Sequence, residues 1–424
     1  MTTTDWIRLA TIPFFTGAIG WLINWTGLIM LFNPVRMYGI KIPGLRDAAT
    51  LLPRKLQEIP GWMDGRVGWQ GIVPARAAKM GSIAVDKAIA KLGTPAEFYR
   101  QLEPDEIALK ILEMFSPEVP SIVDETMRRE QPRLWATVPP RARQAVYERV
   151  QAQLPQIVKH VTDEIGEYID LLLDPKLMVI EHFYENPALV NRIFRDVGQR
   201  ELRLMVNFGF LFGFLFGIPV AVIVHFLPHW WLLPILGVIV GWCTNLLGMY
   251  VIFEPVRPRR IGPFTVQGLF LRRQDEVAEV YAQIIADDVI TLENIGNFLL
   301  DGPSGDRTRQ MLKEAMEPAI DLAAGPARGA VRVAVGSREY DNIRNSVAAQ
   351  AADYTMVPFR DPEFSRHQSE RIRTLVAART KELPPEDFVE MLRAAIKEDE
   401  WMLYVHGAVM GLIGGLIHLA IFGA

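Results

Sequence analysis

The sequence predicts an all-α integral membrane protein in which four transmembrane helices form two parallel repeats, joined by long cytoplasmic regions of helical bundle or coiled coil. Three observations predict this fold class. Four apolar runs are long enough to cross a bilayer, a motif of the first run recurs in the third, and the polar segments carry apolar residues at helical spacing. A chain of 424 residues also exceeds the size at which a single core usually stops growing, so more than one structural unit is expected.

The four apolar runs each contain at least the ~20 residues that a hydrocarbon layer of ~30 Å requires. They extend from Leu9 to Phe32, Leu204 to Leu227, Trp230 to Phe253 and Met402 to Phe422. Only Pro228 and His229 separate the second run from the third, which predicts a tight hairpin between those two helices. The first run is expected to remain as a transmembrane helix, because its leader has no basic residue and no small-residue cleavage site follows it.

These runs divide the chain into five predicted segments. They are transmembrane helix 1 over 1–33, cytoplasmic region 1 over 34–203, transmembrane helices 2 and 3 over 204–254 with their turn near 228–229, cytoplasmic region 2 over 255–400, and transmembrane helix 4 over 401–424. Five basic residues against one acid follow the first helix, and the same count follows the third. The positive-inside rule therefore predicts a bacterial cytoplasmic membrane protein with both long regions in the cytoplasm and both termini outside.

The duplication is visible in two series of residues. Gly20, Trp21, Asn24, Gly27, Phe32, Pro34 and Arg36 recur at a constant offset of 221 as Gly241, Trp242, Asn245, Gly248, Phe253, Pro255 and Arg257. In the second and fourth helices the triplet Gly209, Gly213 and Gly217 recurs at an offset of 198 as Gly407, Gly411 and Gly415. Corresponding helices cross in the same direction, which predicts a pseudo-twofold axis along the membrane normal.

The repeated glycines and asparagines are predicted to hold the membrane helices together. Glycines at every fourth position leave a helix face without side chains, so the second and fourth helices are expected to pack closely against neighbours. Asn24 and Asn245 lie near the inner ends of their helices, where an unpaired amide is costly. Each is interpreted as hydrogen-bonding to a partner on another helix, and their equivalence suggests that they face each other or a shared centre. A substrate- or ion-binding role is the alternative.

The segment that follows each inward helix combines proline with basic residues. Pro34 and Pro255 are expected to end their helices at the inner headgroups, which puts Arg36 and Arg257 within reach of phosphate. Aligning 51–58 with 269–276 adds further basic residues to the same candidate site for an anionic lipid headgroup. These are Arg54, Lys55, Arg272 and Arg273. The alternative is a general positive-inside anchor that binds no particular lipid.

The long polar regions are predicted to be helical, and no run in them is typical of a strand. Apolar residues recur at spacings of three and four from Val150 to Leu172, which draws one stripe along a helix that Pro155 should kink or begin. Further helices are expected near 275–300, 307–322, 337–356 and 385–400. Such stripes serve a bundle or coiled-coil seam far more often than a cofactor site.

Catalytic and metal-binding patterns are not found in the sequence. It has no phosphate-binding glycine loop, no His-Glu-x-x-His, no Gly-x-Ser-x-Gly and a single cysteine, Cys243, so no catalytic residue, metal site or cofactor is assigned. His225 and His229 have ligand-like spacing but flank a helix end, and His406 and His418 are interpreted as packed or interfacial residues. The 45 basic and 49 acidic residues show no basic stripe for nucleic acid.

The repeated Gly-Trp-x-x-Asn segment with Phe-x-Pro, the stretch from Tyr168 to Leu171 leading to Arg200-Glu201-Leu202, and the glycine-rich last helix together resemble a known family. It is the YheB/YjiN type of bacterial membrane protein, domain-of-unknown-function family 445, which is UPF0754-like. The resemblance implies a helical fold in the bacterial cytoplasmic membrane. The family has no assigned activity, so it supplies no catalytic residues.

Three functional classes follow from these observations. The preferred one is a non-enzymatic scaffold or lipid-interacting protein, whose partners would be membrane lipids with anionic headgroups, a cytoplasmic or membrane protein, or further copies of the chain. A carrier or channel for a small or lipidic solute is the alternative, because duplicated halves and paired asparagines are compatible with a pathway in an oligomer. A membrane enzyme would require a catalytic cluster that the sequence does not contain.

Overall fold

The computed structural model describes residues 3–53, 57, 61–62, 65–86, 94–324, 336–354, 361–397 and 399–422. The chain divides into two compact units, which are described separately. Unit 1 consists of Met1–Ala88, Ile180–Tyr281 and Ala377–Ala424, and unit 2 of Ile89–Val179 and Ala282–Val376. Most of the described residues are helical, and four helices are long and apolar enough to cross a membrane. The predicted class of an all-α membrane protein is therefore confirmed.

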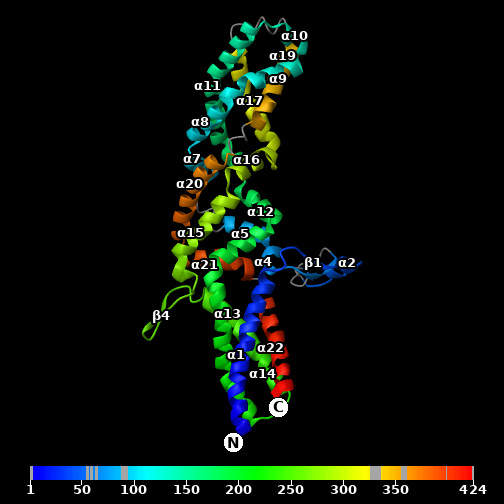
Figure 1. Ribbon diagram of the computed structural model, residues 1–424, viewed down its shortest axis with the longest axis vertical. Coiled ribbons are helices and arrows are strands. Elements are labelled where there is room, and N and C mark those ends of the chain that lie inside the picture. The colour runs from blue at the N-terminus through cyan, green and yellow to red at the C-terminus, as the bar shows by residue number, and fades with distance from the viewer. Residues whose placement is uncertain are drawn as a thin grey trace. The chain divides into compact units, whose positions relative to one another are not determined.

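Unit 1 contains these four membrane helices, which run side by side in Figure 1 with both chain ends at the same end of the bundle. They are α1 (Thr3–Phe32), α13 (Pro187–Phe226), α14 (Leu232–Phe253) and α22 (Glu400–Phe422). Helix α13 begins well before the apolar run that it contains, because Pro187 at its first position starts a helix that meets no further break before the membrane. Residues 227–231 form the short turn between α13 and α14.

The membrane helices form two equivalent pairs, α1 with α13 and α14 with α22. A Cβ atom built on Gly20 would lie 2.2 Å from the backbone oxygen of Gly209, and one on Gly241 would lie 2.0 Å from that of Gly407. Real Cβ atoms do not approach an oxygen so closely, so each pair requires glycine at this crossing. The same two residues recur in both repeats, which means that the sequence duplication is a duplication of helix packing.

Further along the same interface, the other glycines of the two triplets also meet backbone. A Cβ on Gly213 would lie 2.4 Å from the backbone oxygen of Thr16, and one on Gly411 would lie 2.0 Å from that of Gly237. Backbones this close gain dispersion and weak Cα–H contacts along several turns. In lipid, where apolar surface gives helices no reason to associate, such contact is the main source of packing energy.

Two small β-hairpins follow α1 and α14, so the expectation that the chain contains no strand was wrong. Strand β1 (Tyr38–Lys41) pairs with β2 (Arg66–Trp69), and β3 (Arg259–Ile261) pairs with β4 (Phe264–Val266), both antiparallel. Helix α2 (Leu45–Thr50) lies between β1 and β2 in the chain. The strands have only three or four residues each, too few for an alternating pattern to stand out from neighbouring loop sequence.

Short helices complete the described part of unit 1 around these hairpins. They are α4 (Ile72–Ala75), α5 (Ala77–Ala84), η3 (Leu271–Arg273), most of α15 (Gln274–Ile284) and of α12 (Pro175–Glu185), the end of α20 (Pro362–Lys381), and α21 (Pro385–Lys397). Helix α21 contacts α4, α5 and η3. These contacts place helices from distant parts of the sequence beside the exits of α1 and α14.

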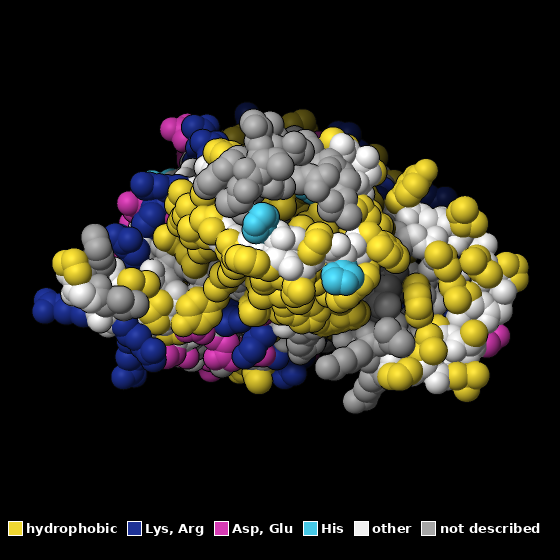
Figure 2. All heavy atoms as spheres, turned by 90° about the horizontal axis from the view of Figure 1, so that it is seen from below, with side chains coloured by type: hydrophobic (Ala, Val, Ile, Leu, Met, Phe, Trp, Pro, Cys, Tyr) yellow, Lys and Arg dark blue, Asp and Glu magenta, His cyan; other side chains and the backbone are white. Residues whose placement is uncertain are grey.

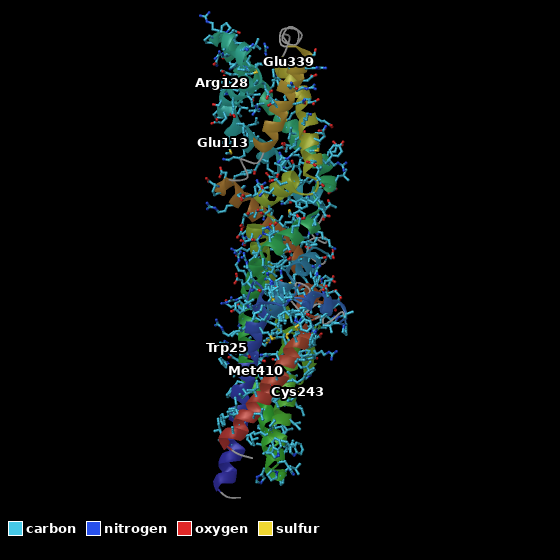
Figure 3. All side chains as sticks on the ribbon, turned by 90° about the vertical axis from the view of Figure 1, so that its right-hand side faces the viewer. Trp25, Glu113, Arg128, Cys243, Glu339 and Met410 are labelled. Atoms are coloured by element: carbon cyan, nitrogen blue, oxygen red, sulfur yellow. The ribbon has the colours of Figure 1, made fainter. Side chains whose placement is uncertain are left out.

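Unit 2 is built from helices whose apolar stripes face one another. Its helices are α7 (Pro95–Gln101), α8 (Pro104–Phe115), η2 (Ser116–Glu118), α9 (Val119–Glu130), α10 (Pro132–Thr137), α11 (Pro140–Leu172), η4 (Ile285–Val289), α16 (Leu292–Asp301), α17 (Gly305–Ala324) and α19 (Ser337–Tyr354), with most of α20. Figure 3 shows Glu113 and Arg128 among the charged side chains that project from these helices.

The predicted stripe on α11 forms part of the core of unit 2. Ile157 and Val161 of α11 are buried in one cluster with residues of α16 and α17, which are Leu300, Leu312, Ala315 and Met316. Pro155 does not begin the helix, because α11 starts at Pro140 and continues through it. The helix expected over 275–300 is also interrupted, since Thr291 accepts a hydrogen bond from the backbone nitrogen of Asn294 and starts α16.

Unit 2 also contains a polar cluster around Asp124. Its Oδ1 accepts hydrogen bonds from the hydroxyl of Tyr147 at 2.5 Å and from Nε1 of Trp135 at 3.0 Å, and Oδ2 pairs with Arg128 at 2.8 Å. The hydrogen bond from Tyr147 and the one from Trp135 lower the pKa of the Asp124 carboxyl. The ionised carboxylate therefore ties α10 and α11 to α9.

The helix packing of unit 1 makes a first prediction. Gly20→Ala should lower the melting temperature of the purified protein, because the new methyl group meets the Gly209 oxygen. Gly27→Ala is the matched control, since a Cβ there has only ordinary contacts, at 3.8 Å or more. Thermal unfolding in mild detergent measures both variants, and equal melting temperatures would contradict the close approach.

The Asp124 cluster makes a second prediction. Because the pKa of this carboxyl is lower in the folded state, its contribution is present above the unfolded pKa and is lost as the pH falls through the folded one. Asp124→Asn should cost roughly 1–3 kcal/mol at neutral pH. Hydrogen exchange in α9 and α10 should then be faster than in the wild type, and the two rates should converge in acid. Glu125→Gln, at an exposed neighbouring carboxylate, should leave exchange unchanged.

Candidate functional site at the hairpin end of the membrane helices

The end of the bundle from which the two β-hairpins leave is called the hairpin end, and equivalent residues of both repeats gather there. At each exit, a Gln-Gly pair after the hairpin fastens the chain back to the helix. Gln70 Nε2 donates to the Val35 oxygen at 2.9 Å, and Gln267 Nε2 donates to the Val256 oxygen at 3.3 Å. The next residues, Gly71 and Gly268, donate their backbone N–H groups to the carbonyls of the exit prolines, at 2.9 and 3.1 Å.

Both glycines are required by the close return of the chain. A Cβ on Gly71 would lie 2.6 Å from the carbonyl carbon of Phe32, and one on Gly268 would lie 2.8 Å from that of Phe253. Phe32 and Phe253 are the equivalent last residues of α1 and α14. Each hairpin is therefore fixed to the final turn of a membrane helix.

Beyond each Gln-Gly pair, an arginine in the equivalent position forms an ion pair with the other repeat. Arg76 Nε lies 2.9 Å from Asp399 Oδ2, and Arg273 Nη1 lies 2.7 Å from Glu201 Oε1. Asp399 and Glu201 are themselves equivalent, since they differ by the same offset of 198 that relates the glycine triplets. The arginine of each repeat thus pairs with the acid at or just before the apolar run of the second membrane helix of the other repeat.

These two ion pairs, called exchanged because each joins a residue of one repeat to a residue of the other, are largely removed from solvent. The side chains of Glu201 and Asp399 are 1% and 5% exposed, and those of Arg273 and Arg76 are 26% and 17% exposed. Hydrogen bonds to Glu276 and Glu201 raise the pKa of the Arg273 guanidinium above its ordinary value, so it stays charged. A charge buried this deeply is tolerated because its partner is held in hydrogen-bonding geometry.

A third, partly buried arginine lies at the same end of the bundle and has no equivalent pairing among the described residues of the first repeat. Arg393 of α21 binds Glu400 at 2.7 Å and Glu254 at 3.4 Å, and its guanidinium lies over the Phe253 ring, 5.6 Å from the centroid. The hydroxyl of Tyr404 donates to Glu400 at 3.0 Å. The start of α22 is therefore joined to α21 and to the end of α14.

The two repeated asparagines are buried, at 0% and 6% exposure, and each is used within its own helix pair. Asn24 Nδ2 donates to the backbone oxygen of Met205 at 2.6 Å, and Asn245 Nδ2 donates to that of Leu403 at 2.5 Å. Met205 and Leu403 are equivalent in the repeat. Each amide thus bonds to the backbone of its partner helix rather than to the other asparagine.

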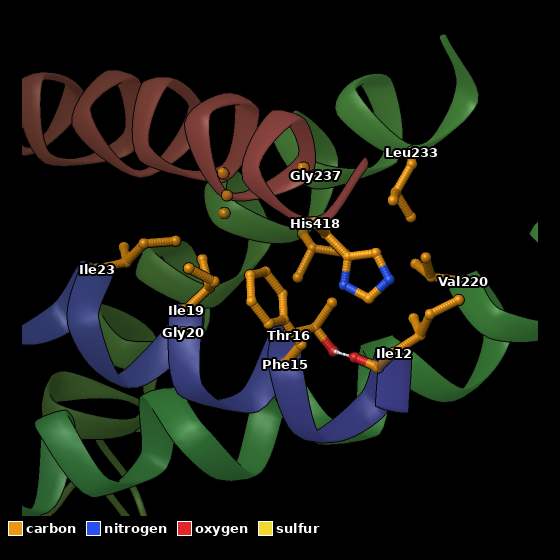
Figure 4. A pocket seen from close by; sticks show the side chains of 15 residues that line it. Ile12, Phe15, Thr16, Ile19, Gly20, Ile23, Val220, Leu233, Gly237 and His418 are labelled. Atoms are coloured by element: carbon orange, nitrogen blue, oxygen red, sulfur yellow. Dashed lines mark hydrogen bonds between the residues drawn. The ribbon is translucent and has the colours of Figure 1, made fainter. Parts of the chain in front are cut away.

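Two cavities lie where the helix pairs meet, and both are lined by equivalent residues. The first is shown in Figure 4, where the imidazole of His418 points into the space between Ile12, Val220 and Leu233. Phe15 packs edge-on against His418, with 4.8 Å between ring centroids. The second cavity, near the hairpin end, is lined by apolar side chains that include Leu31 with its equivalent Ile252 and Met205 with its equivalent Leu403.

The six basic residues predicted to bind a lipid headgroup are found in different environments. Arg36 and Arg272 are exposed, and Arg257 is an exposed residue paired with Glu386 at 2.8 Å. Arg273 is the ion-pair partner of buried Glu201, and Arg54 and Lys55 lie outside the described residues.

The alignment of 51–58 with 269–276 does not describe the structural repeat. Arg76, not Lys55, occupies the position of Arg273, because the Gln-Gly pairs set an offset of 197 beyond the hairpins. Sequence reasoning missed Arg76 and Asp399. A search for a second Gln-Gly followed by arginine five residues later would have found the first of them.

The other singled-out residues form no site together within the described part of the chain. His225, in the last turn of α13, and His229, in the turn between α13 and α14, are exposed, and Cys243 lies in the membrane helix α14. The described residues contain no group of three His, Cys, Asp or Glu side chains that could hold a metal ion. Seen along the helices from the end opposite the hairpins, the bundle presents a mainly hydrophobic surface (Figure 2).

The fold and this site define a multi-pass, all-α membrane protein with an internally duplicated helix bundle. Part of the chain is similar to proteins named UPF0754 membrane proteins. One of Bacillus cytotoxicus is 41% identical over 69 residues, which are 16% of this chain and 18% of that protein, and one of Shouchella clausii is 42% identical over 76 residues, 16% and 20%. One of Bacillus mycoides is 40% identical over 67 residues, 15% and 18%.

The chain thus matches about a fifth of the length of these curated relatives. Their names state a membrane location, in agreement with the four candidate spans. The names do not mention an activity. No family model matches the chain. No solved structure matches it either.

The exchanged ion pairs make a third prediction. Arg273→Met should destabilise the bundle by roughly 3–5 kcal/mol, because it leaves the Glu201 carboxylate buried without a partner, whereas the double variant Arg273→Met with Glu201→Leu should recover most of that loss. Unfolding by added denaturing detergent measures both. Arg257→Met is the matched control, since its pair with Glu386 is exposed and should contribute less than about 1 kcal/mol. An equal loss in the two single variants would contradict the buried pairing.

Proposed function

We propose that this protein is a non-enzymatic scaffold of the bacterial cytoplasmic membrane, which anchors the helical unit 2 and binds anionic lipid at its hairpin end. The supporting observation is that most of the duplicated glycines and asparagines, and the equivalent arginines after the hairpins, are engaged in contacts within the protein. The repeated glycines at the helix crossings, such as Gly20 and Gly241, meet backbone, the repeated asparagines bond to carbonyls, and the arginines after the hairpins pair with buried acids. Membership of the YheB/YjiN type, domain-of-unknown-function family 445, is part of this proposal.

The orientation belongs to the same proposal. Basic residues concentrate after α1 and after α14, and the positive-inside rule then puts the hairpin end at the cytoplasmic face, with both chain termini outside. Unit 2 would lie in the cytoplasm, where its exposed charged helices could hold a protein partner. Further copies of the chain are the other partner that we consider, through the lipid-facing sides of the membrane helices.

Arg36 and Arg272 are the best candidates for lipid binding among the described residues. Both are exposed, and both lie within a few residues of the exit prolines or of the Gln-Gly pairs that fasten the hairpins. An exposed guanidinium at the headgroup level can donate two hydrogen bonds to one phosphate. Arg273 contributes to the bundle instead, through its ion pair with Glu201.

Lipid binding is tested by gentle purification from native membrane, followed by mass spectrometry of the retained lipids. Arg36→Gln with Arg272→Gln should reduce retained anionic lipid several-fold, because two phosphate-binding charges are removed. Arg133→Gln with Arg141→Gln, which removes two exposed charges from unit 2, is the matched control and should leave the lipid content unchanged. Unchanged anionic lipid in the first variant would overturn the lipid-binding part of the proposal.

A carrier or channel for a small or lipidic solute is the second candidate, and the two cavities between the helix pairs favour it. Transport would require the bundle to open, since Asn24 is fully buried. Asn24→Cys or Asn245→Cys in a Cys243→Ala background tests this with a water-soluble thiol reagent. Labelling from either side of the membrane would support a pathway, whereas complete protection would support the scaffold.

A further inference from the structure

The β1–β2 hairpin of unit 1 has one face made of apolar and aromatic residues. In the antiparallel register Tyr38 lies opposite Trp69 and Ile40 lies opposite Val67, so these four side chains share one face of the two-stranded sheet. The alternate residues form the other face, which carries two glycines and the basic pair Lys41 and Arg66. The hairpin is therefore amphipathic, with a period of two.

The apolar face is unusually exposed for such residues. The side chains of Tyr38 and Ile40 are 82% and 77% exposed, and Val67 is 45% exposed. Two further apolar residues on either side of α2, Ile42 and Leu51, are also exposed. A two-stranded hairpin with both faces in water is marginal at best, so a partner surface is expected to cover it.

The depth of this face relative to the membrane helices is fixed by hydrogen bonds. Trp69, at one end of the apolar row, donates its Nε1 hydrogen to the backbone oxygen of Met30 at 3.3 Å, and the following residue, Gln70, binds the Val35 carbonyl. Met30 belongs to the last turn of α1, whose candidate span is Ala10–Phe32. The apolar row therefore starts at the level where a spanning helix leaves the hydrocarbon layer.

The direction of the face agrees with this depth. In Figure 2, which looks along the membrane helices toward the hairpin end, the lobe on the right contains β1 and α2 and turns hydrophobic side chains toward the viewer. The viewer is on the side that the bilayer occupies around the helices. The second hairpin, on the opposite side of the bundle in Figure 1, is shorter and carries Arg259 and Arg260 on β3.

We propose that the β1–β2 hairpin is a membrane-surface anchor whose Tyr38, Ile40, Val67 and Trp69 face inserts into the lipid interface beside α1. Aromatic residues at the headgroup level, here the opposed pair Tyr38 and Trp69, are typical of interfacial anchors, and Lys41 and Arg66 on the opposite face lie where they can reach phosphate. The occupant of the face is the lipid bilayer itself. This deepens the proposed function by naming a lipid-binding surface, and it rests on that function only in placing the hairpin end at the membrane surface.

The test compares two neighbouring positions on opposite faces of β1. In a Cys243→Ala background, Ile40→Cys and Lys41→Cys are labelled with a small environment-sensitive fluorophore, and the full chain is reconstituted in neutral phosphatidylcholine vesicles. Nitroxide-bearing phosphatidylcholine should quench the probe at position 40 about threefold more than the probe at position 41, because only the former enters the acyl boundary. Iodide in the water should quench them in the reverse order.

The other outcomes overturn the proposal. Equal quenching of both probes by iodide means that the face stays in water, and protection from iodide without nitroxide quenching means that a protein surface covers it. A gel-filtration profile like that of the Cys243→Ala parent shows that the labelled variants are folded. Since neutral lipid is used, failure here is distinct from loss of anionic lipid in Arg36→Gln with Arg272→Gln.

Discussion

The close approach of helix backbones at the glycine rows is the constraint on which the rest of unit 1 depends. Within lipid, apolar side chains gain nothing by leaving hydrocarbon for another helix, so association relies on contact and on hydrogen bonds. Gly20 against Gly209 and Gly241 against Gly407 allow the contact, and the Asn24 and Asn245 amides reach partner carbonyls one turn away. A larger side chain at these crossings would separate the helices and leave both amides buried without acceptors.

At the hairpin end, ion pairs join the two repeats, whereas within the membrane the helices meet through close backbone contacts. After α1 and after α14, the chain passes through a proline and a hairpin, and a Gln-Gly pair then binds it back to the end of the helix. An arginine follows each Gln-Gly pair and lies against the bundle. Arg76 and Arg273 then pair with acids that belong to the opposite repeat. Because each pair joins a residue of one repeat to a residue of the other, the charges hold the two halves together, while glycine contacts hold each half together. The two hairpins differ, since β1–β2 has a long apolar face and β3 carries two arginines.

Much of the fold could be predicted because its signals are long or repeated. Four apolar runs and the stripe containing Ile157 and Val161 extend over many turns, so helical periodicity dominates local noise. The strands could not be predicted, because three or four residues carry too little pattern. In the candidate site, Arg272 and Arg273 look alike in sequence, yet one is exposed and the other is paired with Glu201. Local composition cannot separate them, since their difference depends on an acid 72 residues away.

The sequence by itself determined the number of membrane helices, the duplication and the residues that carry it, because these follow from apolar length and from identities at fixed offsets. Only the tertiary structure decided how those residues are used. It shows that each asparagine binds a backbone carbonyl of its own helix pair, and that Arg76 rather than Lys55 is the structural equivalent of Arg273. It also shows that each of the two ion pairs joins one repeat to the other. The physical reason is that a buried amide or charge needs a partner in space, and chain separation says nothing about which partner the fold brings near.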